Sequence, residues 1–136
     1  MQAMSRARTC YDHLAGRLGV QITDALTRSG FIDQSAGFSV TQAGLDWFAR
    51  TLSIDVDALR AAQRPLARPC IDWTERRPHL GGGAGAAMCG QFFARGWVTR
   101  IGTGRAVLVT PSGERALRDL VGVDVAGVDV AGVDAA

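Results

Sequence analysis

The residues of this sequence best suited to chemistry are thiols, imidazoles and carboxylates, and many of them gather near its middle. Positions 70–80 hold one thiol, two carboxylates, an indole, two guanidinium groups and an imidazole. Such a density would suit an active site or a metal site. Thiolates and imidazoles are the ligands that tetrahedral zinc prefers. Four side chains could form a four-coordinate site of this kind: Cys10, His13, Cys70 and His79. We expect no cofactor other than such a divalent metal ion.

The spacing of these four residues leaves their role open. Cys10 and His13 are three positions apart and would share one face of a predicted helix. Cys70 and His79 are nine positions apart across a proline, which is wider than the paired ligands of a zinc ribbon. In the alternative, Cys10, Cys70 and Cys89 are small buried apolar side chains and the histidines bond to backbone groups. A thiol sensor would instead need an exposed cysteine of low pKa.

The charged cluster beside these candidates also has two interpretations. On a predicted helix, Asp72 and Arg76 would pair at i, i+4, and Glu75 would face His79 across the proline. A carboxylate beside a histidine could support acid–base catalysis. No nucleophile, phosphate-binding loop or second motif accompanies the cluster. We therefore predict that the protein is not an enzyme and that the cluster is a salt-bridged joint anchored by Trp73.

Composition indicates a single globular domain, and its net charge does not indicate any one class of binding partner. The chain has 136 residues, of which 47% are hydrophobic, and this is enough for one packed core. Its net charge of +2 is too small to indicate nucleic acid by itself, although all 15 basic residues are Arg. No apolar run could span a membrane, and the first residues lack the apolar core of a secretion signal. Three cysteines cannot all pair with one another, so we expect a reducing cytoplasm.

The elements that would position the candidate residues in the first half are helices around one short hairpin. Apolar residues at spacings of three and four predict a helix over 7–29. Its inward residues would be Leu14, Leu18, Ile22, Ala25 and Leu26. A hairpin is expected over 31–40, and Thr41 would then cap a helix over 42–52. The inward residues of that helix would be Leu45, Phe48 and Leu52.

The second half repeats this order after a connector. Asp55 would cap a short helix over 56–63, and Pro69 would start a helix that ends at Arg77, before Pro78. A further helix is predicted over 79–95, a hairpin over 97–109 and a helix over 111–120 that begins with Thr110 and a proline. Residues 122–136 repeat Gly-Val-Asp-Val-Ala and should fray in water.

An internal repeat relates the two halves. An offset of 66 places His13 on His79 and Gly30 on Gly96, but it does not place Cys10 on Cys70. We therefore predict a mainly helical α+β fold of two tandem winged-helix-like repeats, each a helix, a β-hairpin and a helix. A central helical connector would join them, and their glycine-rich helix faces would pack together. The single domain would cover 6–121, with repeats at 8–55 and 79–121 and the connector at 56–78.

Two stretches of the sequence resemble a known protein family. Residues 8–20, RTCYDHLAGRLGV, and 70–80, CIDWTERRPHL, resemble signature stretches in the C-terminal region of a group of ArsR-type winged-helix bacterial transcription regulators. The Val-Thr-x-x-Gly elements at 40–44 and 109–113 resemble the joints between strand and helix in that group. The resemblance covers about residues 6–121 and implies a cytoplasmic, DNA-associated regulator that is usually a homodimer.

This resemblance implies a division of labour within the regulator. In such proteins an N-terminal winged helix reads the operator, and there is no room for one before Arg6. We therefore expect a C-terminal fragment or a short relative that serves in dimerisation or effector response, with DNA held through the absent winged helix. The alternative is a metal- or thiol-responsive sensor module without direct DNA contact. A weaker candidate for DNA-backbone contact is the second hairpin, where Arg100 and Arg105 flank a glycine-rich tip.

Overall fold

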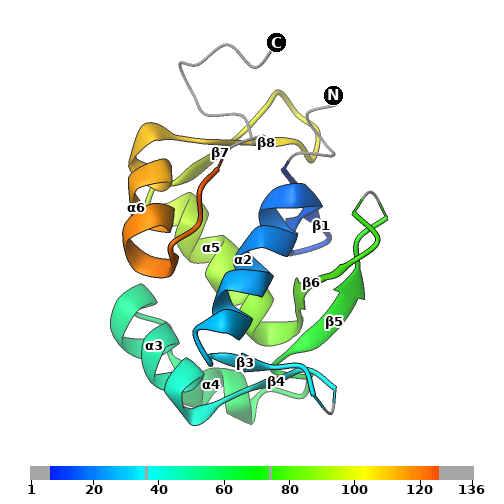
Figure 1. Ribbon diagram of the computed structural model, residues 1–136, viewed down its shortest axis with the longest axis vertical. Helices are drawn as coiled ribbons and strands as arrows, with labels where there is room; N and C mark the ends of the chain where they lie inside the picture. Colours follow the sequence, from blue (N-terminus) through cyan, green and yellow to red (C-terminus); the bar gives the residue numbers. More distant parts are fainter. Residues whose placement is uncertain (1–6, 36, 74, 126–136) are drawn as a thin grey trace.

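The computed structural model describes residues 7–35, 37–73 and 75–125, in which five helices alternate with eight short strands (Figure 1). The helices are α2 (Gly16–Arg28), α3 (Gln42–Leu52), α4 (Val56–Ala61), α5 (Gly82–Ala94) and α6 (Pro111–Val121). The strands are β1 (Arg8–Cys10), β2 (His13–Ala15), β3 (Ile32–Asp33), β4 (Ser39–Val40), β5 (Arg68–Ile71), β6 (Pro78–Gly81), β7 (Val98–Arg100) and β8 (Val107–Val109). They pair as four separate antiparallel hairpins. The predicted α+β class is confirmed.

The order of elements occurs twice along the chain. Hairpin β1–β2, helix α2, hairpin β3–β4 and helix α3 are followed, after the short α4, by β5–β6, α5, β7–β8 and α6. The corresponding helices have equal lengths, 13 residues for α2 and α5 and 11 for α3 and α6. Each repeat therefore starts with a hairpin, which the predicted order of helix, hairpin and helix omitted.

Two segments predicted to be helical are hairpins instead. Residues 8–15 form β1–β2, and the predicted connector helix ending at Arg77 is replaced by β5–β6. The physical reason lies at Gly16 and Gly82, whose φ angles are 72° and 74°. Glycine adopts this left-handed conformation readily, but the interior of an α-helix does not contain it. Helices α2 and α5 therefore cannot extend toward the N-terminus past Gly16 and Gly82. The central connector is helical only in α4.

The predicted helix caps are confirmed. Thr41 Oγ1 accepts the backbone N–H of Gly44 at 3.0 Å and donates to the carbonyl of Gly30 at 2.6 Å. Thr110 makes the same two bonds at the equivalent place in the second repeat, and Asp55 accepts from the third residue of α4. Each cap satisfies a backbone donor that the first turn of a helix leaves without a partner.

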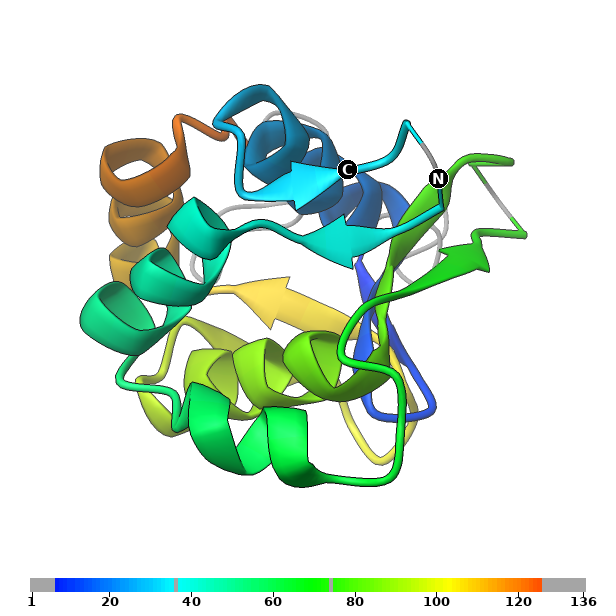
Figure 2. The ribbon, with the colours of Figure 1, turned by 90° about the horizontal axis from the view of Figure 1, so that it is seen from below.

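One hydrophobic core is shared by both repeats. All of the residues predicted to face inward from the helices over 7–29 and 42–52 are buried, although Leu14 lies in β2 and not in a helix. Helix α6 packs on α2, and α3 packs on α5, so the second helix of each repeat contacts the first helix of the other. Figure 2 shows α3 and α6 on the opposite side of the molecule from hairpin β5–β6. The shared core holds the two repeats in one unit.

The chain after α6 continues into this core. Val123 and Val125 are each 4% exposed, so the fraying predicted from residue 122 does not occur over 122–125. The rest of the predicted tail, residues 126–136, lies outside the described residues. In the described part of the chain, no helix combines the length and the apolar character needed to cross a membrane.

Candidate metal centre

Each repeat presents one Cys–His pair on its first hairpin. Cys10 lies directly opposite His13 in β1–β2, and Cys70 lies directly opposite His79 in β5–β6. Side chains that face each other across an antiparallel pair project from the same face of the hairpin. The two cysteines therefore occupy equivalent positions in the two repeats, as the two histidines do. The prediction that only the histidines are equivalent is wrong. Two residues separate Cys10 from His13 but eight separate Cys70 from His79, so no single offset aligns both pairs.

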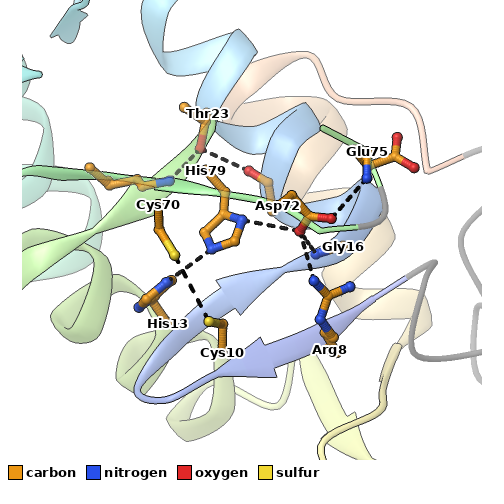
Figure 3. A network of polar contacts seen from close by, with 11 residues as sticks. Arg8, Cys10, His13, Gly16, Thr23, Cys70, Asp72, Glu75 and His79 are labelled. Carbon is orange, nitrogen blue, oxygen red and sulfur yellow. Dashed lines mark hydrogen bonds and ion pairs between the residues drawn. The ribbon is translucent and has the colours of Figure 1, made fainter. Parts of the chain in front are cut away.

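The four side chains converge between the two hairpins (Figure 3). One ligand atom from each of Cys10, His13, Cys70 and His79 lies within 4.8 Å of all the others. The two Sγ atoms are 3.9 Å apart, and the two Nε2 atoms are 3.0 Å apart. The histidines are buried, at 7% and 1% exposure, while both cysteines are half-buried free thiols. The structure thus brings together all four residues singled out in the sequence.

Two glycines make room for the histidines. A Cβ on Gly19 would lie 3.4 Å from the Cβ of His79, and one on Gly85 would lie 3.3 Å from the Cβ of His13. In both places it would also overlap the carbonyl group of the strand that precedes the helix. The prediction that the glycine-rich faces of the two helices pack together is therefore wrong for these glycines. Each faces the hairpins instead, and α2 packs on β6 while α5 packs on β2.

Asp72 is fully buried behind His79 and is surrounded by donors. Its Oδ2 lies 3.1 Å from Nδ1 of His79, 3.1 Å from an Arg8 guanidinium nitrogen and 2.6 Å from the backbone N–H of Gly16. Its Oδ1 accepts the backbone N–H of Glu75 at 3.0 Å. A guanidinium group and the N-terminus of α2 both favour the ionised carboxylate. Asp72 therefore acts as an acceptor toward the His79 ring (Figure 3).

His13 has a carboxylate partner of its own. Its Nδ1 lies 3.2 Å from Asp12 Oδ1, and the other oxygen of Asp12 accepts from Arg64 at 2.9 Å. Partial burial raises the pKa of Asp12, but the hydrogen bonds and charges of Arg64 and His13 together hold it below its ordinary value. Both imidazoles therefore place one nitrogen on a carboxylate and the other at the centre of the cluster.

Burial sets the protonation of the deeper groups. Burial and, to a smaller extent, the neighbouring His13 together lower the pKa of His79 to about 4, and Asp72 offsets only part of this. Burial also raises the pKa of the Cys70 thiol, to which the adjacent Cys10 contributes. At neutral pH the His79 ring is therefore neutral.

The charged cluster joins the two repeats, although through contacts other than those predicted. Asp72, which follows β5, pairs with Arg8 of β1 and His79 of β6. Oε1 of Glu75 lies 3.9 Å from Nε of Arg17. Trp73 is 63% exposed, with the Arg8 guanidinium stacked 4.4 Å above its ring, so it is not a buried anchor. The predicted joint is present as a hairpin and not as a helix.

The remaining candidates lie away from the cluster. Cys89 is buried in α5, where burial raises its pKa to about 11, as expected of a small apolar core residue. Arg100 and Arg105 are exposed on the β7–β8 hairpin. That hairpin is tied to β1, since the Arg105 carbonyl accepts the N–H of Thr9 at 2.9 Å and Val107 N–H donates to Ala7 at 3.1 Å. It is therefore not a freely projecting wing.

Comparison with known proteins finds a transcription regulator of similar sequence. The chain is similar to the uncharacterized HTH-type transcriptional regulator YdfF of Bacillus subtilis (strain 168), with 37% identity over 120 residues. The matched region is 88% of this chain and 53% of YdfF, so the chain spans about half the length of this curated relative. No family model and no solved structure matches the chain.

Proposed function

We propose that this chain is the C-terminal, effector-linked and dimerising part of an ArsR-type transcription regulator whose DNA contact is made by another part of the complete protein. The observation that carries this is the 37% identity to an HTH-type regulator over only 53% of that protein. The ArsR type rests on the resemblance of residues 8–20 and 70–80 to signature stretches of that group.

The helices of the described residues favour a DNA-recognition helix in another part of the complete protein. Within the described ranges, α3 and α4 are the one pair of consecutive helices with no strand between them. Helix α4 has six residues and buries none of them. A recognition helix must lie in the major groove and present several side chains to base edges. Arg100 and Arg105 could at most contact phosphates, which fix position without reading sequence.

Exposed apolar side chains support a role in dimerisation. Tyr11 lies in the turn of β1–β2, Ile71 ends β5 and Trp73 lies in the turn that follows, and they are 88%, 67% and 63% exposed. Large apolar side chains that are exposed to this degree are candidates for protein–protein contacts. A second copy of the chain would cover them in a homodimer.

Gel-shift and sedimentation measurements test this proposal. With a DNA fragment from upstream of its own gene, YdfF should shift the DNA, whereas this chain alone should sediment as a dimer and leave its own upstream fragment unshifted. A shift by the chain alone that Arg105→Ala abolishes would show that the β7–β8 hairpin contacts DNA and that the proposed division is wrong.

A second candidate function is a metal- or thiol-responsive sensor module that does not contact DNA. The convergence of two thiols and two imidazoles within 4.8 Å favours it. The two candidates differ in one respect: only the first predicts that the complete protein binds DNA.

A further inference from the structure

We propose that Cys10, His13, Cys70 and His79 bind one thiophilic divalent metal ion of the zinc class, with one Cys–His pair supplied by each repeat. The proposal goes beyond the regulatory function and does not depend on it. Hydrogen-bond geometry, the positions of the sulfur atoms and the symmetry of the two hairpins support this site.

A continuous row of polar contacts runs through the two histidines from Asp12 to Asp72. Three consecutive contacts join Asp12 to His13 at 3.2 Å, His13 to His79 at 3.0 Å and His79 to Asp72 at 3.1 Å. Each contact needs one hydrogen between its two atoms. A neutral imidazole carries one N–H, and an ionised carboxylate carries none. Two hydrogens cannot serve three contacts, so this chain of contacts needs either a third proton or a metal ion between the two rings.

The carboxylate partners of the two histidines indicate where such a metal ion would lie. If each histidine donates its Nδ1–H to its carboxylate, both Nε2 lone pairs point toward the centre of the cluster. Histidines that bind metals almost always donate their other N–H in this way, to a carboxylate or a carbonyl. A metal ion bound by these lone pairs would lie between the two Nε2 atoms, on the side where Cys10 and Cys70 converge (Figure 3). A shared proton would satisfy the nitrogens but would give the two sulfur atoms no role.

The distances between the ligand atoms are close to those of a tetrahedral zinc site. Zn–S bonds of about 2.3 Å in a tetrahedron place two sulfurs about 3.8 Å apart, and Zn–N bonds of about 2.0–2.1 Å place two nitrogens about 3.3–3.4 Å apart. The Sγ atoms of Cys10 and Cys70 are 3.9 Å apart, and the two Nε2 atoms are 3.0 Å apart. Small shifts of the imidazole rings would complete the geometry. Two thiolates would neutralise a divalent ion, and sulfur and imidazole ligands disfavour Mg²⁺ and Ca²⁺.

The ion would hold the two repeats together. One Cys–His pair comes from β1–β2 and the other from β5–β6, which belong to different repeats. Behind His79, Asp72 continues the network to Arg8 and to the first residue of α2. The metal would therefore close the junction between the repeats, and its loss would loosen it. The half-buried cysteines leave a side through which an ion could be exchanged.

Co²⁺ and Zn²⁺ binding to the purified 136-residue chain test this site. We expect one ion per chain, the visible bands of tetrahedral Co²⁺, and a near-ultraviolet thiolate-to-Co²⁺ absorption. Cys10→Ser and Cys70→Ser should each lower the affinity at least about 10–100-fold, as disturbing a metal site does, and weaken the thiolate absorption. Cys89→Ser is the matched control and should bind like the wild type.

A variant outside the ligand set keeps the test decisive if the cysteine variants fail to fold. Asp12→Asn removes the carboxylate behind His13 and should weaken Zn²⁺ binding about 10–100-fold with an unchanged circular dichroism spectrum. Asp57→Asn, on exposed α4, is its control. Wild-type protein that binds no Co²⁺, or binds it without thiolate absorption, overturns the proposal. Equal loss of binding in Cys89→Ser and Cys10→Ser also overturns it. None of these outcomes depends on DNA binding.

Discussion

The Nε2 atoms of His13 and His79 face each other at 3.0 Å, although the two residues are 66 positions apart in the chain. Each ring has a carboxylate on its other nitrogen and a cysteine opposite it on the same hairpin. The repeat thus produces a junction with the same three kinds of group from each half.

The carboxylate of Asp72 should contribute strongly to stability even without metal. Asp72→Asn removes the charge that pairs with the fully buried guanidinium of Arg8. Breaking a buried ion pair from one side costs about 3–5 kcal/mol. Asp24→Asn, which breaks the more exposed pair with Arg77, should cost less than about 1 kcal/mol. Urea denaturation of the metal-free proteins measures both values. Equal losses would contradict the central place given to Asp72.

Glycines at equivalent positions of α3 and α6 should be needed for full stability of the fold. A Cβ on Gly44 would overlap the carbonyl oxygen of Phe31, and one on Gly113 would overlap that of Trp97. Alanine at either site should destabilise the protein by about 1–3 kcal/mol, as overpacking does. Gly90→Ala is the control, because Gly90 is exposed inside α5 with nothing near its Cβ. It should stabilise the protein by about 0.5–1 kcal/mol in thermal denaturation. Tolerance of alanine at Gly44 and Gly113 would show that this packing is looser than described.

Cys89 should be the slowest of the three cysteines to react. Burial raises its pKa to about 11, so at pH 8 only about one molecule in a thousand carries the reactive thiolate. The reactive fraction grows as the pH rises toward that pKa. Iodoacetamide should label Cys10 and Cys70 of the metal-free protein and spare Cys89 until denaturant is added, as peptide mass mapping would show. Labelling of Cys89 at the rate of Cys10 would contradict its burial.

The two sulfur atoms of the cluster should form a disulfide when the metal-free protein is oxidised. The Sγ atoms of Cys10 and Cys70 are 3.9 Å apart and would need to close to about 2.05 Å. One hydrogen peroxide would take up two thiol hydrogens and two electrons to give the disulfide and two waters. Peptide mapping should find the Cys10–Cys70 link in both the wild type and Cys89→Ser, and Zn²⁺ should slow its formation. A link to Cys89, or oxidation at equal rates with and without Zn²⁺, would argue against the cluster.

Local signals explain which parts of the fold could be predicted. The buried face of α2 and the cap at Thr41 depend on neighbours within a few positions, and both are confirmed. Hairpins β1–β2 and β5–β6 were missed because their strands have only three or four residues beside strongly helical sequence. The positive φ angles of Gly16 and Gly82 mark where each helix begins, and glycine at both positions was the available signal.

The candidate site was predictable as a set of residues but not as an arrangement. The four candidate ligands can be picked out from the sequence, whereas turns of unequal length hide the equivalence of Cys10 and Cys70. Asp72 was assigned to a local pair because its actual partner, Arg8, is 64 positions away. Contacts of that range arise from packing of the two repeats, and no local pattern reports them.

The most direct test of the proposed metal site is X-ray absorption at the zinc edge of the Zn²⁺-loaded chain. Two sulfurs at about 2.3 Å and two imidazole nitrogens at about 2.0–2.1 Å are expected. Cys10→Ser should reduce the sulfur shell to one, and Cys89→Ser should leave it at two. A shell made of nitrogen and oxygen alone in the wild type would contradict the proposed site.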